Sequence, residues 1–320
     1  MCETVFLTGA TGFIGGHVRS ALLEAGYRVR ALVRHASATL DGCETVAGDL
    51  EHVGAFAHAL DGCRYVIHCA ALYSFSPRDR RRMRSVNVDG TAALLEATRI
   101  AGVERAVVTS SASTVGPSHD GRPEDERSMP EPSDAPSSYH ASKREQERAA
   151  LAARVPAVLL LPTAPVGPGD HTPTPTGRLV RDFSQGRIVA RPPRGGMNLV
   201  PVEDVARAHV RALLHGTPGE RYLLGGENLS LDDVWDLLSR VTGRAVPRIR
   251  VPTPLLVTMA YADELRCRTL PFARPVVPIE GVHMAHHFMY VDSSKAQKAL
   301  DHRPGSVRAA LERAVSWYRN

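Results

Sequence analysis

The sequence predicts an α/β fold, a doubly wound parallel sheet with a smaller and less regular C-terminal domain. In the first two-thirds of the 320-residue chain, short apolar runs alternate with amphipathic stretches, which is typical of a parallel sheet covered by helices. The apolar runs are continuous, as expected of strands that are buried on both faces. After Leu161 this rhythm breaks, because residues 162–196 are rich in Pro, Gly and Thr.

Six strands are expected in the first part, over residues 4–7, 29–33, 45–47, 65–68, 105–109 and 157–161. Apolar residues at helical spacing predict a helix that Gly26 closes and helices over 91–101 and 139–153. Later segments predict a strand at 197–202 and helices over 203–215, from Ser230 to 241, and over 306–319. We therefore expect a first domain over 1–163, to which the chain returns within 197–226, and a second formed mainly by 164–320.

Composition excludes several classes of protein. Hydrophobic residues make up 43% of the chain and charged residues 23%, so a packed core is expected and wholesale disorder is not. No apolar run approaches the length of about 18 residues that spans a bilayer, and no basic region followed by an apolar one opens the chain. We thus expect neither a membrane protein nor a secreted one. Five cysteines without a C-x-x-C pair favour a reducing cytoplasm over a disulfide framework or zinc site.

Charge gives no sign of a nucleic-acid partner. The net charge is +5 and the pI is near 9.1, but arginines are scattered along the chain apart from one cluster at 78–84. That cluster is either a solvated helix face or a site for an anionic substrate. His283, His286 and His287 are closely spaced, but no carboxylate or cysteine completes a site, so no metal is predicted.

A glycine-rich turn directly follows the first strand, in the run Thr8-Gly9-Ala10-Thr11-Gly12-Phe13-Ile14-Gly15. In such a turn the first glycine allows the bend, the second lets a pyrophosphate approach the backbone, and the third lets the helix pack closely on the strand. The helix N-terminus that follows attracts phosphates. Because this turn lies between a strand and a helix, we predict a dinucleotide site; the alternative is a glycine turn without a ligand.

Arg34 predicts which dinucleotide binds. It follows the second strand, where an acidic residue would hold the ribose 2′-hydroxyl of NAD and a cation accommodates the 2′-phosphate of NADP. No Asp or Glu occurs between Glu24 and Asp41 to compete for this position. We therefore predict NADP, with NAD less favoured; the alternative for Arg34 is an ordinary surface arginine.

Tyr139 and Lys143 lie one helical turn apart near a helix start, so both project from one face. Lysine is rare in this chain, and a compact ammonium can serve both sugar hydroxyls and a phenol. We expect this cation to lower the tyrosine pKa from about 10 toward the working pH, which makes Tyr139 a general acid or base. Ser110 and Ser111 end the fifth strand, where one can hydrogen-bond a substrate oxygen and the other can cap the strand end.

These motifs together resemble one family, the extended short-chain dehydrogenase/reductases of the NAD-dependent epimerase/dehydratase type. The resemblance spans essentially the whole chain and rests on the glycine turn, Asp49-Leu50, Val86-Asn87-Val88-Asp89-Gly90-Thr91, Thr109-Ser110-Ser111 and Tyr139 with Lys143. Within the family, Leu32-Val33-Arg34 and Thr109-Ser110-Ser111-Ala112 are similar to the dihydroflavonol-4-reductase branch. Segments 173–178 and 219–229 look most like proteins labelled hopanoid-associated sugar epimerases.

The resemblance implies a Rossmann fold and a set of site residues. Catalysis would involve Ser111, Tyr139 and Lys143. The cofactor would contact Gly9, Gly12, Phe13, Ile14, Gly15, Arg34, Asp49, Leu50, Ala70, Ala71, Tyr139, Lys143 and Pro162. Asn87 would be a supporting polar residue or, alternatively, a helix-start cap. The family often dimerises through the helices at 91–101 and 139–153, so a homodimer is expected.

The resulting prediction is an NADP-dependent oxidoreductase that transfers a hydride between nicotinamide and a ketone, aldehyde or secondary alcohol of a small organic substrate. The first alternative is a nucleotide-sugar epimerase or dehydratase that retains NAD. Leu161 and Ala164 disfavour it, since many nucleotide-sugar members of the family carry polar or arginine residues there. The second alternative is a non-catalytic dinucleotide-binding regulator, which the set of Ser111, Tyr139 and Lys143 disfavours.

Overall fold

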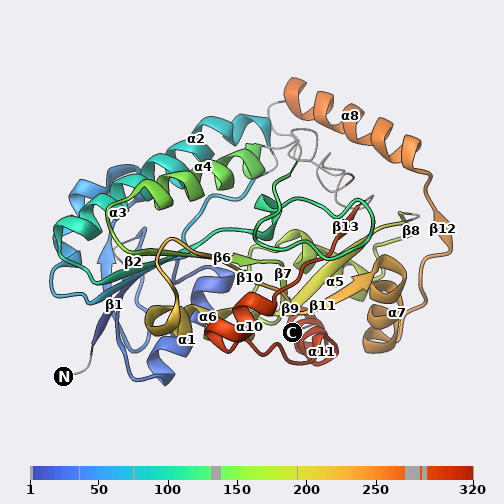
Figure 1. Ribbon diagram of the computed structural model, residues 1–320. Coiled ribbons are helices and arrows are strands. Elements are labelled where there is room, and N and C mark those ends of the chain that lie inside the picture. Colours follow the sequence, from blue (N-terminus) through green and yellow to red (C-terminus); the bar gives the residue numbers. More distant parts are fainter. Residues whose placement is uncertain are drawn as a thin grey trace.

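Seven parallel strands form the central sheet, in the order β10-β6-β5-β4-β1-β2-β3. The structure is a computed structural model and describes residues 3–35, 37–74, 76–130, 138–192, 194–270, 282 and 287–319. The strands of this sheet are β1 (Thr4–Thr8), β2 (Arg28–Val33), β3 (Cys43–Ala47), β4 (Tyr65–His68), β5 (Arg105–Thr109), β6 (Ala157–Pro162) and β10 (Arg221–Leu224). Helices cover both faces of the sheet (Figure 1), which confirms the predicted α/β fold.

Among the described residues, ten α-helices accompany these strands. They are α1 (Phe13–Glu24), α2 (Arg80–Arg84), α3 (Gly90–Ile100), α4 (Ser138–Ala152), α5 (Pro175–Ser184), α6 (Val202–His215), α7 (Leu231–Thr242), α8 (Thr253–Thr269), α10 (Ser294–Leu300) and α11 (Val307–Arg319). The part of the chain that the structure describes holds no helix long and apolar enough to cross a membrane.

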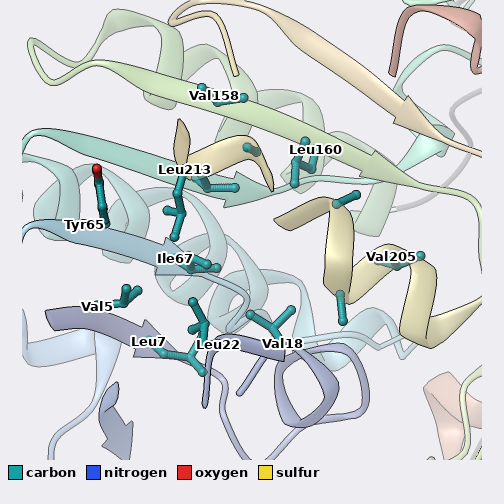
Figure 2. Close-up of a cluster of buried hydrophobic side chains, with 14 of the residues drawn as sticks. Val5, Leu7, Val18, Leu22, Tyr65, Ile67, Val158, Leu160, Val205 and Leu213 are labelled. Carbon is teal, nitrogen blue, oxygen red and sulfur yellow. The ribbon is translucent and has the colours of Figure 1, made fainter. Parts of the chain in front are cut away.

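The two faces of the sheet are buried by different helices, because successive side chains of a strand point to opposite sides. Figure 2 shows one face, where side chains of β1 and β4 such as Leu7 and Ile67 pack with Leu22 of α1 and Val205 of α6. On the other face, Phe6 and its neighbours pack against α3 and α4. The continuous apolar runs in the sequence follow from this burial on both sides.

A smaller second sheet lies beyond the sixth strand. It contains β7 (Ala164–Val166), β9 (Gly196–Pro201), β11 (Glu227–Ser230) and β13 (Phe288–Met289), and a separate pair joins β8 (Ala190–Arg191) to β12 (Ile249–Arg250). Its core includes Val180 of α5, Trp235 of α7 and Leu311 of α11. Ser230 and Asp233 form a capping box at the start of α7, the helix that was expected from Ser230 to 241.

The register of the central strands gathers their carboxyl ends at one edge. Thr8 pairs with His68, and His68 pairs in turn with Val108. The residues that follow β1, β4 and β5 are therefore neighbours although they lie far apart in the sequence. Ligands of open parallel sheets bind at this edge, so the structure brings together the segments that carry the predicted site.

The arginine cluster at 78–84 lies on and around the short helix α2. Its arginines are exposed, whereas Met83 is buried in the same helix. Arg82 pairs with Glu51, with 3.4 Å between Nε and Oε2, and Arg84 pairs with a carboxylate of α4. Of the two alternatives for the cluster, these contacts favour a solvated helix face.

Candidate active site

The turn between β1 and α1 has no room for side chains at its first and last glycines. Gly9 has φ +76°, and a Cβ there would lie 2.7 Å from the backbone nitrogen of Ala70. A Cβ on Gly15 would collide with the Gly9 carbonyl oxygen. Gly12, in contrast, is exposed, and that same oxygen, at 3.3 Å, is the one atom of the described structure near its Cβ position. A phosphate can therefore come close to this backbone.

The first turn of α1 begins at this exposed backbone. Gly12 is the N-cap residue and has no side chain to hydrogen-bond the first helical N–H groups, and Phe13 and Ile14 are half-buried. The positive end of the helix dipole and its N–H groups are suited to an anion. The turn thus fits the pyrophosphate of a dinucleotide.

Arg34 and Asp49 follow neighbouring strands, because β2 and β3 pair Val33 with Ala47. Arg34 is exposed, and no carboxylate among the residues described pairs with its guanidinium. The Asp49 carboxylate accepts a hydrogen bond of 3.0 Å from the backbone N–H of Glu51 and caps the short helical segment after β3. Arg34 is therefore the side chain at this edge with a charge available for a ligand.

Leu50, Ala70 and Ala71 surround this edge with apolar surface. Leu50 is buried, and its carbonyl oxygen lies where a Cβ on Gly90 would collide. Ala70 donates its backbone N–H to Thr8 Oγ1 at 3.2 Å, which holds the end of β4 against the glycine turn. Ala71 is exposed. These positions are compatible with the cofactor contacts that the resemblance implies.

Asn87 fixes the main chain just after Ala71. Its Oδ1 accepts a hydrogen bond of 2.7 Å from the N–H of Leu72, and its Nδ2 donates one of 2.9 Å to the carbonyl of the same residue. Asn87 lies inside the π-helical turn Ser85–Asp89, which joins α2 to α3. The alternative that it caps a helix start is therefore wrong: it supports the loop after β4.

Tyr73 is the functional candidate that sequence reasoning missed. It follows Leu72, whose main chain is fixed by the two hydrogen bonds from Asn87. Its ring packs on Tyr139, with 4.5 Å between ring centroids and an interplanar angle of 70°. Its side chain is 37% exposed. Nothing in the sequence distinguishes this tyrosine from any other in a loop, and its contact with Tyr139 depends on the tertiary fold.

The hydroxyls of Ser111 and Tyr139 meet at the end of β5. A hydrogen bond joins the two side chains. Ser111 also accepts a hydrogen bond of 3.2 Å from the N–H of Ser113 and so caps a short helical turn. Ser110 points elsewhere and donates its hydroxyl to Glu147. The residue that faces the tyrosine thus also serves as the cap, whereas we expected two serines to divide these tasks.

Lys143 is buried one turn after Tyr139. Its Nζ donates to the carbonyl of Thr109 and to Oε1 of Gln146, both at 2.9 Å. These bonds tie α4 to the end of β5 and fix the position of the ammonium. Burial lowers the pKa of Lys143 to about 8, although the nearby Glu147 carboxylate acts in the opposite direction.

The expectation that Lys143 lowers the pKa of Tyr139 is wrong for this structure. Burial raises the pKa of Tyr139 to about 12, and the hydrogen bond with Ser111 opposes that rise only in part. The physical reason is that the Lys143 ammonium is directed at Thr109 and Gln146. Tyr139 is therefore a protonated phenol at neutral pH, the form that can donate a proton.

A buried chain of hydrogen bonds connects Lys143 to the glycine turn. Gln146 donates from Nε2 to Oγ1 of Thr91 at 3.0 Å, and that oxygen lies 2.8 Å from Nε2 of His68. The other imidazole nitrogen of His68 lies 2.7 Å from the hydroxyl of Thr8. Burial lowers the pKa of His68 to about 3, so this imidazole is neutral. Polar residues at buried strand and helix positions are the only trace of this network in the sequence.

Pro162 and Glu147 complete the surroundings of the site. Pro162 is buried at the end of β6, where it pairs with Leu224 of β10. Glu147 accepts a hydrogen bond of 2.7 Å from the Thr114 hydroxyl and forms an ion pair with Arg221, with 3.1 Å between Oε2 and Nε. The ion pair links α4 to β10 beneath the residues that follow β5.

No metal centre is found in the described part of the chain, where no three side chains of the metal-binding types come together. His283 and His286 lie outside the residues that the structure describes.

Comparison with known proteins agrees with this geometry. Residues 5–225 match the NAD dependent epimerase/dehydratase family. Over 332 residues, covering the whole chain and 96% of the relative, the sequence is 38% identical to a Synechocystis protein provisionally named dihydroflavonol 4-reductase. It is 34% identical over 324 residues to sterol demethylase protein B of Methylococcus capsulatus, covering 99% of this chain and 98% of that one.

A solved structure shows the same fold over nearly the full length. The crystal structure of gox2253 superposes with a TM-score of 0.86 at 35% sequence identity, covering 99% of this chain and 98% of the other. The glycine turn, the Ser111–Tyr139–Lys143 arrangement and these matches lead to one conclusion: the chain belongs to the NAD dependent epimerase/dehydratase family, within the extended short-chain dehydrogenase/reductases.

Proposed function

We propose that this chain, an NAD(P)-dependent oxidoreductase by family, uses NADPH to reduce a ketone or aldehyde of a small organic molecule to an alcohol, or catalyses the reverse reaction. The observation that carries the proposal is the arrangement of the Tyr139 phenol, which is hydrogen-bonded to Ser111 and lies one helical turn from the buried Lys143. The relatives named as a dihydroflavonol reductase and as a sterol demethylase protein support reduction of an organic molecule over sugar chemistry.

The residues that would hold the cofactor lie along the carboxyl edge of the sheet. The glycine turn and the first N–H groups of α1 fit the pyrophosphate. Arg34 provides the cation for a 2′-phosphate, which favours NADP over NAD. The remaining contacts are proposed for Asp49, Leu50, Ala70, Ala71 and Pro162, with Tyr139 and Lys143 at the ribose.

The reaction needs a proton donor and a hydrogen-bond donor at the carbonyl oxygen. Bound NADPH supplies the hydride. The Tyr139 phenol gives its proton to the oxygen, on which negative charge develops, and the Ser111 hydroxyl stabilises the same oxygen. Lys143 stays fixed by its bonds to Thr109 and Gln146, so its ammonium is held one helical turn from the phenol, where it would contact the cofactor ribose.

Tyr73 gives the substrate side of this site an apolar character. Its partly exposed ring lies against Tyr139, so a substrate whose carbonyl reaches the phenol would come close to this ring. An apolar or aromatic group beside the carbonyl would pack favourably there. We therefore propose a substrate with such a group, and a site divided between residues 1–163 for the cofactor and mainly 164–320 for the rest of the substrate.

A direct test is to incubate the purified chain with NADPH and a panel of ketones and aldehydes. We expect consumption of NADPH that depends on the carbonyl compound, with little consumption of NADH. Extraction of tightly held NAD, together with no net consumption of NADPH, would instead identify an epimerase or dehydratase that recycles its hydride. Binding of dinucleotide without any turnover would identify a regulator.

A further inference from the structure

Exposed apolar side chains concentrate at one rim of the molecule. Among the residues that the structure describes, twelve large hydrophobic side chains are exposed. Seven of the twelve lie on α8, at its C-terminal end or at the β8–β12 pair: Val189, Ile249, Leu255, Met259, Tyr261, Leu265 and Leu270. These elements are close together, because β8 pairs with β12 and β12 leads into α8 along the outer edge (Figure 1). We call the seven side chains and their elements the α8 face.

Helix α8 carries apolar residues on its exposed side as well as on its buried side. Its buried side consists of Ala260, Asp263 and Cys267, which follow one another at helical spacing. The opposite side carries leucine, methionine and tyrosine with fractional exposures from 44% to 63%. An ordinary surface helix places its apolar stripe on the core. A concentrated exposed apolar patch is typical of an interaction site.

Basic residues exceed acidic ones at the same rim. Segments 187–194 and 244–270 together hold eight arginines, Asp263 and Glu264. Asp182 and Asp232 pair with three of these arginines from outside the segments, so the formal excess is +4. Arg191 and Arg250 share the carboxylate of Asp232. No acidic side chain within the described ranges pairs with Arg194 or Arg248.

We propose that the α8 face docks on the surface of an anionic phospholipid bilayer. Apolar side chains flanked by arginines are the combination that inserts at the headgroup boundary and attracts anionic lipids. A second copy of the chain is a poorer occupant, because a two-fold contact would bring two faces of like charge together. The absence of a spanning helix in the described chain is compatible with attachment from one side.

The end of α8 also reaches the active-site segment. Arg78 donates from Nη2 to the carbonyl of Leu270 at 3.0 Å, only five residues along the chain from Tyr73. A bilayer at the α8 face would therefore lie on the side of the molecule where Tyr73 flanks Tyr139. The docking proposal itself does not depend on the proposed reaction, because it is tested by binding alone.

The test is co-sedimentation of the purified full chain with two kinds of vesicle, pure phosphatidylcholine and equal parts phosphatidylcholine and phosphatidylglycerol. We expect binding to the mixed vesicles and weak binding to the neutral ones. Arg248→Glu should reduce the affinity for mixed vesicles by at least about fivefold, because each basic residue near an anionic surface contributes about that factor. Leu265→Ser should reduce it by a similar factor through lost apolar burial.

Matched controls lie elsewhere on the surface. Leu214→Ser on α6 removes a leucine of comparable exposure, 56% against 63% for Leu265, and Arg28→Glu reverses an exposed arginine of β2. Both controls should bind vesicles like the wild type. The proposal is overturned if mixed vesicles are not bound, if neutral vesicles bind equally well, or if controls and α8-face variants lose binding alike. A wild-type dimer that Leu265→Ser converts to a monomer in light scattering, without vesicle binding, would make α8 a subunit contact.

Discussion

The buried polar network beside Tyr139 and the α8 face differ in where their side chains find partners. Around Lys143, buried polar atoms are hydrogen-bonded to one another from Thr8 to Gln146. On the α8 face, apolar side chains are exposed and arginines exceed the acidic partners available. The network finds its hydrogen-bond partners within the chain, whereas the α8 face indicates a binding partner outside the chain.

The two regions meet different functional requirements. A proton donor works only if its position and protonation state are fixed, and buried hydrogen bonds fix both. A docking surface must instead remain accessible until its partner arrives. Substitutions in the network should therefore change catalysis strongly, and substitutions on the α8 face should leave catalysis and stability almost unchanged.

The largest effect is expected for Tyr139→Phe. This change keeps the ring and its packing against Tyr73 but removes the phenolic proton that would be transferred to the carbonyl oxygen. General acid catalysis contributes about 10²–10⁴ in rate, so turnover with any accepted ketone and NADPH should fall by that factor, while NADPH affinity should change much less because the other cofactor contacts remain. Retention of more than about a tenth of wild-type turnover would contradict the assigned role.

Arg34→Asp should reverse the cofactor preference. If the guanidinium holds the 2′-phosphate, a charge-assisted contact of about 1.5–3 kcal/mol is lost, equivalent to about 10- to 100-fold in affinity. A carboxylate in its place can accept the ribose hydroxyls of NAD. Titration of both cofactors against wild type and variant measures the ratio directly, and an unchanged NADP/NAD ratio would remove Arg34 from the site.

The sequence predicts the strand boundaries beside the candidate site well, because they depend on local order along the chain. The strand ends before Gly9, Arg34 and Ser111 were placed to within a residue by continuous apolar runs. The network was not predictable in the same way. His68 and Gln146 are far apart in sequence, and only the pairing of β1 with β4 and the packing of α4 bring them onto one chain of hydrogen bonds.

Helix α8 was missed for a different reason. Its segment 255–262 is apolar, but the pattern does not reveal which side faces the core, and the buried side is a narrow stripe with an aspartate. Sequence reasoning assumes that apolar residues point inward. In α8, large apolar residues also lie on the exposed side.

A smaller effect is expected for Gln146, which positions Lys143. Gln146→Glu places a carboxylate beside the ammonium and should raise the Lys143 pKa above its value of about 8. For the wild type, NADPH affinity should decline as the pH rises through about 8, because the ammonium loses its charge, and the variant should shift this decline to higher pH. Gln146→Leu, which removes the bond, should weaken NADPH binding by about tenfold at neutral pH. An identical pH profile of the dissociation constant in wild type and Gln146→Glu would show that the contact does not position Lys143.

The smallest effect is expected for Leu265→Ser in the absence of lipid. Its side chain is 63% exposed, so its replacement creates no cavity and leaves no buried polar group. Surface substitutions of this kind change the free energy of unfolding by less than about 0.5 kcal/mol. Leu160→Ala, in the fully buried core of the sheet, should cost about 2–5 kcal/mol in the same urea titration. A large loss of stability in Leu265→Ser would mean that this side chain packs against the protein in solution. The α8 face would then not be an exposed surface, and its contrast with the buried network would be wrong.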